Sequence, residues 1–95
     1  MLERCKRAMR IKTDAYDAEI TDLIEAALAD LGLAGIQKTG ADEAEEYPLV
    51  RRAVVTYVRQ HFGTPDDYDK LKASYDEQKA QLQTSSAYWK EDGEG

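Results

Sequence analysis

Residues that carry chemistry are scarce in this 95-residue chain, which has one cysteine, Cys5, and one histidine, His61. A single thiol excludes an intrachain disulfide and a zinc site built from thiolates, and a single imidazole excludes His–His metal motifs. No glycine-rich phosphate loop is present. We therefore predict that the protein is not an enzyme. We expect no catalytic, cofactor-binding or metal-ligating residues.

Long apolar runs and an excess of positive charge are also missing. The apolar runs are short, such as Ala26–Ala29, so we expect no membrane span. Thirteen Lys and Arg residues against 19 Asp and Glu give a net charge of −6, which argues against a protein whose main task is to grip nucleic acid. With 42% hydrophobic and 34% charged residues, the composition is that of one small globular domain.

The charges are unevenly distributed along the chain. Residues 1–12 carry five basic groups and one acid, whereas residues 13–48 carry ten acids and one lysine. Arg4 and Arg7 in the basic segment are candidate partner contacts. The basic segment of one copy can meet the acidic segment of a neighbouring copy head to tail, or it can be a solvated helix face. Binding of DNA through this basic segment is a further alternative, which would make the protein a small helical DNA-binding regulator.

Apolar spacing predicts four helices and an all-α fold. The first spans Leu2–Met9, and the second begins after a cap at Thr13 or Asp14 and ends at Leu31, with Gly32 in the left-handed conformation. The third runs from Pro48 to Gly63. Its many β-branched residues leave a strand as an alternative.

The fourth predicted helix runs from Pro65, with Thr64 as its cap, to about Gln83. Residues 38–46 are expected to be a weakly structured loop. We expect residues 1–86 to form the helical domain and residues 87–95 a flexible C-terminal tail. A narrow seam on the fourth helix and two aromatic residues near the C-terminus are candidate subunit or partner contacts: Tyr68, Leu71, Tyr75, Leu82, Tyr88 and Trp89.

In the order and spacing of several short motifs, the sequence resembles the phage and prophage head–tail connector family. Members of this family are also described as DNA-packaging or head-completion adaptor proteins. The motifs are MRI at residues 9–11, DAYDAEI at 14–20, LIEAA at 23–27, YVRQHFG at 57–63, PDDY at 65–68 and LKASYDEQKAQLQTS at 71–85. The resemblance extends over about residues 8–86.

This resemblance implies a virion structural protein that assembles in the host cytoplasm. Family members are small helical proteins that form a homo-oligomeric ring in the phage neck, between the portal and the next neck or tail-completion protein. The ring extends the DNA channel, and DNA passes through it without sequence-specific binding. An acidic channel wall would repel the phosphates, and its candidates are Asp14, Asp17, Asp22 and Glu25, for which helix capping or a solvated face is the alternative.

Overall fold

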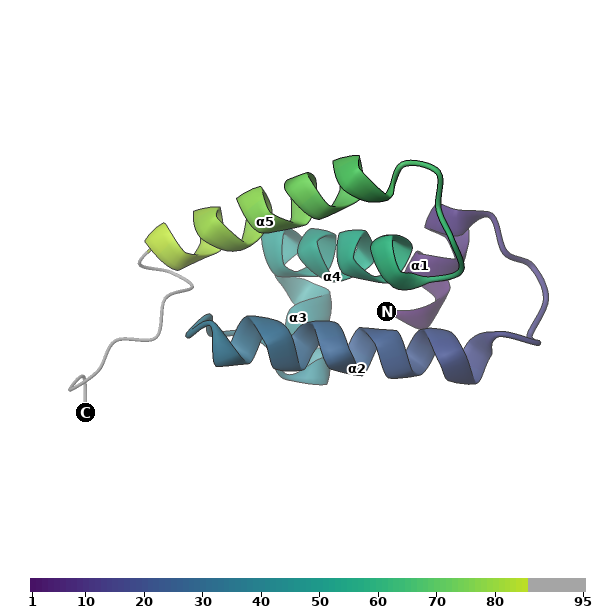
Figure 1. Ribbon diagram of the computed structural model, residues 1–95. Coiled ribbons are helices and arrows are strands. Elements are labelled where there is room, and N and C mark those ends of the chain that lie inside the picture. Colours follow the sequence, from purple (N-terminus) through teal and green to yellow (C-terminus); the bar gives the residue numbers. More distant parts are fainter. Residues whose placement is uncertain (86–95) are drawn as a thin grey trace.

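Five α-helices make up most of residues 1–85, the part of the chain that the computed structural model describes (Figure 1). They are α1 (Leu2–Met9), α2 (Asp17–Leu33), α3 (Ala41–Glu46), α4 (Pro48–His61) and α5 (Tyr68–Thr84). No β-strand occurs within residues 1–85. The predicted all-α fold is therefore confirmed, and the third predicted segment is a helix.

Helix α4 lies at the centre of the bundle and contacts each of the other four helices. Helices α2 and α5 lie on opposite sides of it (Figure 1). One core joins all five helices, because each places at least one apolar side chain against the others. Its buried members are Cys5, Ile20, Ile24, Ala27, Leu31, Ile36, Ala44, Val50, Ala53, Val54, Val58, Tyr75 and Leu82.

The predicted start of α2 is wrong by about three residues. The Thr13 hydroxyl accepts a hydrogen bond from the Ala15 amide, at 3.1 Å between nitrogen and oxygen. This bond stabilises a turn that precedes the helix. Helix α2 begins at Asp17, and its N-cap Tyr16 makes no side-chain capping bond.

The end of α2 also differs from the prediction, because Gly32 lies inside the helix and Gly35 takes the left-handed conformation, with φ 89°. The Gly35 amide donates to the Gly32 carbonyl, and the Ile36 amide donates to the Leu31 carbonyl. This pattern is a Schellman motif, in which the residue after the glycine packs back on the last turn. Ile36 and Leu31 are both buried, and their contact places the left-handed glycine at residue 35, three residues later than expected.

Helix α3 occupies residues that the sequence predicted to be a loop. It is only six residues long, with Gly40 as its N-cap and Pro48 shortly after its end. Ala44 is its one buried residue. Two alanines among four acids create no apolar stripe, so the helix could not be recognised from spacing.

The turn between α4 and α5 is longer than predicted. Helix α4 begins at Pro48 as expected and is followed by Gly63, whose φ of 65° is left-handed. Pro65 lies in the connecting loop and does not open the next helix, which begins at Tyr68 after Asp67. None of the helices within residues 1–85 combines the length and apolar character that a membrane span needs.

Candidate functional site

The single cysteine and the single histidine of the chain both pack against other side chains. Cys5 is fully buried, and this burial raises the pKa of its thiol to about 11, although the nearby amino terminus acts in the opposite direction. The ring of His61 packs on that of Tyr57, with centroids 4.3 Å apart, and against the edge of Tyr68. Across residues 1–85, no three His, Cys, Asp or Glu side chains are grouped closely enough to hold a metal ion.

A basic hollow of about 450 Å³ lies between α4 and α5, and we call it the arginine groove. Three arginines of α4 and one of α1 supply its charge, and two polar side chains of α5 form its other wall. The residues of the groove are Arg4, Pro48, Arg51, Arg52, Val55, Thr56, Arg59, Ser74 and Gln78.

Two carboxylates of the same chain neutralise part of this charge. Glu45 lies 3.5 Å from the Arg4 guanidinium, and Asp67 lies 3.9 Å from that of Arg59. Arg51 donates a 2.7 Å hydrogen bond to the Glu45 carbonyl. The Arg52 side chain is exposed and has no ion pair within residues 1–85. Glu45 also pairs with the amino terminus at 3.0 Å, so the two carboxylates do not balance the four guanidinium groups and the groove keeps an excess of positive charge.

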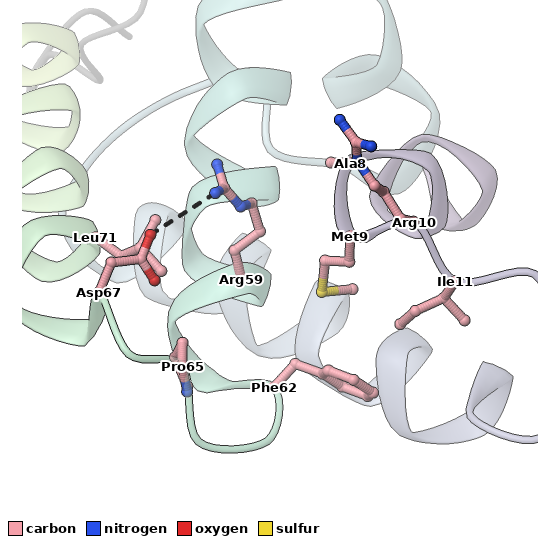
Figure 2. A pocket seen from close by; sticks show the side chains of 9 residues that line it. All are labelled: Ala8, Met9, Arg10, Ile11, Arg59, Phe62, Pro65, Asp67 and Leu71. Atoms are coloured by element: carbon pink, nitrogen blue, oxygen red, sulfur yellow. Dashed lines mark ion pairs between the residues drawn. The ribbon is translucent and has the colours of Figure 1, made fainter.

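A second open hollow, of about 370 Å³, lies where the end of α1 faces the turn between α4 and α5. Figure 2 shows Met9, Ile11 and Phe62 at one side of it and the Arg59–Asp67 ion pair at the other. Arg59 lines both hollows, so the basic surface continues from the arginine groove towards α1.

The four predicted channel acids fall into two structurally different pairs. Asp14 and Asp17 lie 3.2 Å and 2.8 Å from the ammonium group of Lys6, whose side chain is only 6% exposed. The Asp17 carboxylate, followed by that of Asp14, raises the pKa of Lys6 above its ordinary value. Part of the basic segment therefore pairs with acids of its own chain, which the head-to-tail interpretation did not anticipate.

The other two acids remain exposed on the outer side of α2. Asp22 and Glu25 are one turn apart and have no ion pair within the described part of the chain. We call their surface the acidic face of α2. Its members share one helix face opposite the core, at spacings of three and four residues: Ala18, Asp22, Glu25, Ala29 and Leu33. Leu33 is 90% exposed.

Three of the four predicted seam residues are used inside the chain. Leu71, Tyr75 and Leu82 are buried, and only Tyr68, at 40% exposure, is open to a partner. The Tyr75 hydroxyl donates a 2.6 Å hydrogen bond to Asp30 of α2, which also accepts from Lys79 at 3.0 Å. The seam thus holds α5 against α4 and α2, and on its flank Ser74 is half-buried and Gln78 is buried.

The remaining predicted contacts lie near the ends of the chain. Arg4 belongs to the arginine groove, whereas Arg7 is exposed and lines a separate hollow with Lys6, Arg10, Ile11 and Lys12. Tyr88 and Trp89 lie outside the described residues. The arginine groove as a whole was missed, although Arg52, Thr56 and Arg59 follow the spacing of one helix face.

The fold and these surfaces define a small helical protein whose prominent features are charged faces open to other molecules. Residues 1–89 match the family described as phage connector protein, and the chain belongs to that family. It is a family of phage structural proteins, which supports the predicted resemblance to head–tail connectors and a place in the virion. No curated protein and no solved structure matches the chain.

Proposed function

We propose that this protein is the subunit of a homo-oligomeric ring in the phage neck. The ring lies between the portal and the next neck or tail-completion protein, completes the DNA-filled head and extends the DNA channel. The observation that carries the proposal is the family match over residues 1–89, nearly the whole chain. Assembly takes place in the host cytoplasm before the tail is joined.

The distribution of charge supports this role. A ring subunit needs two different surfaces for its two neighbours, because a rotational assembly repeats one heterologous contact. The arginine groove and the acidic face of α2 are two such surfaces of opposite charge. The net charge of −6 suits a channel through which DNA slides without being held.

The alternative function, a small helical DNA-binding regulator, draws its support from the arginine groove. Guanidinium groups are good ligands for phosphates, and a bound duplex would show a steep loss of affinity with salt. The overall negative charge opposes this alternative. Tight duplex binding by the free protein at physiological salt would favour it over the connector.

The test of the proposed function uses phage heads produced without this protein. We expect such heads to lose their packaged DNA, so that the DNA becomes sensitive to added nuclease. Adding the purified protein should restore both nuclease protection and the joining of tails. Heads that retain their DNA and join tails without the protein would refute the proposal.

A further inference from the structure

The arginine groove carries more positive charge than the carboxylates of its own chain balance. Glu45 and Asp67 partly neutralise Arg4 and Arg59, but Arg52 projects into solvent without an ion pair within residues 1–85. The Arg4 Nε atom is buried and has no hydrogen-bond acceptor. Guanidinium groups bind carboxylates through two parallel hydrogen bonds, so acidic side chains of a partner fit this surface.

A buried amide in the wall of the groove has one polar atom without a hydrogen-bond partner. Gln78 is 8% exposed, and its side-chain oxygen has no hydrogen-bond partner. Its Nε2 atom donates to the Ser74 hydroxyl at 3.1 Å. Rotating the amide by half a turn lets the oxygen accept from Ser74 and places the NH₂ group, which is a donor, at the unpartnered position beside the arginines.

The same chain presents a surface of matching chemistry elsewhere. Asp22 and Glu25 project from the acidic face of α2, flanked by Ala18 and Ala29, whose small side chains allow another helix to approach closely. The groove is lined by residues of α1, α4 and α5 and by none of α2. One copy can therefore use both surfaces at the same time, each with a different neighbour.

We infer that Asp22 and Glu25 of one copy bind in the arginine groove of the next copy, with Arg52 as the principal contact. This inference rests on the proposed function and specifies the contact between neighbouring subunits. The contact is heterologous, so its repetition extends the assembly until a rotation closes it into a ring. The two acids would then lie at subunit boundaries, and Leu33 on the same face would be covered by the neighbour.

Charge reversal tests the contact, with the full chain studied by sedimentation velocity at increasing protein concentration, alone and with the portal. Arg52→Glu and the double variant Asp22→Arg/Glu25→Arg should each weaken assembly by about tenfold or more, because like charges would face each other. An equimolar mixture of the two variants should assemble again, since each groove then meets a face of opposite charge. Lys70→Glu and Glu77→Arg, exposed on α5, are matched controls that should assemble normally.

The outcomes separate this inference from the proposed function. If the variants assemble as well as the unmodified chain, the contact is wrong but the ring stands. If the mixture fails to restore assembly, the pairing of these two surfaces is also wrong. A chain that stays monomeric both alone and with the portal overturns the ring and the contact together. Loss of duplex DNA binding by Arg52→Glu, with assembly unchanged, would assign the groove to phosphates and overturn the inference.

Discussion

The hydrogen bond between Tyr75 and Asp30 links the two outer helices, and its removal offers a sharp test of the packing. Tyr75 on α5 donates to the Asp30 carboxylate on α2 at 2.6 Å, and Lys79 donates to the same oxygen at 3.0 Å. Tyr75→Phe deletes one hydroxyl and leaves the ring and the Lys79 contact in place. The change therefore isolates a single bond that joins α2 to α5.

The expected cost follows from the nature of the acceptor. A hydrogen bond to a charged group contributes about 1.5–3 kcal/mol. The Asp30 side chain is 38% exposed, so water and Lys79 replace part of the lost interaction. We expect Tyr75→Phe to lower the free energy of unfolding by about 1–2 kcal/mol. For a domain of this size, each kcal/mol lowers Tm by about 4–8 °C.

Urea denaturation followed by circular dichroism measures this loss. Tyr68→Phe is the matched control, because the Tyr68 side chain is exposed and its hydroxyl makes no hydrogen bond within residues 1–85. The control should change the free energy of unfolding by less than about 0.5 kcal/mol. In a double-mutant cycle with Asp30→Asn, the two changes should be coupled by at least about 0.5 kcal/mol. Equal stability of Tyr75→Phe and the unmodified chain would show that this hydrogen bond does not stabilise the packing of α5 on α2.

The same carboxylate predicts a pH dependence. Burial opposes ionisation of Asp30, but the Tyr75 and Lys79 hydrogen bonds outweigh it and hold the pKa below its usual value. The stabilisation by ionised Asp30 is therefore complete above the pKa of an unfolded aspartate, about 4, and is lost as the pH falls through the lower folded pKa. The stability difference between the unmodified chain and Asp30→Asn should shrink below about pH 4. A constant difference down to the acid transition would contradict this assignment.

Three further predictions concern packing, reactivity and backbone conformation. Leu31→Ala removes a fully buried side chain and should lower the free energy of unfolding, measured with urea, by about 2–5 kcal/mol. Leu33→Ala, at an exposed position of the same helix, should change it by less than about 0.5 kcal/mol. Equal effects would refute the assigned core face of α2. Cys5 should react very slowly with a thiol reagent in the folded protein and rapidly in urea, because it is buried and its pKa is raised to about 11; fast labelling of the folded chain would contradict its burial. Gly63→Ala should destabilise the protein by about 1 kcal/mol, because the left-handed φ of 65° is unfavourable for alanine. No neighbouring atom would contact the new methyl group, so this backbone strain is the whole cost. An unchanged Tm would show that the turn can adopt another conformation.

Local spacing was sufficient to predict the helices that carry several apolar residues. The range Leu2–Met9 and the start at Pro48 agree with the structure because an apolar stripe and a proline at the first turn are local signals. The end of α2 depended on tertiary packing. Gly32 and Gly35 are both plausible stops, and burial of Ile36 against Leu31 selects the second.

The surfaces were harder to predict than the fold, because they depend on which helices become neighbours. Arg4 meets Arg51 and Arg52 only after α1 packs on α4, and nothing in their separation along the chain indicates this. Asp14 and Asp17 were predicted to line a channel, to cap a helix or to face solvent, but the fold brings Lys6 to both of them. Asp22 and Glu25 kept their predicted exposure because a position opposite an apolar stripe is a local property of one helix.

Native mass spectrometry of the particle formed by this protein and the portal tests most directly whether the chain is a ring subunit. We predict that several copies of the chain join each portal assembly as a closed ring, and that Arg52→Glu reduces their number. A particle with the mass of the portal alone, formed in an excess of folded protein, would contradict the claim that this helical chain is a ring subunit of the phage neck.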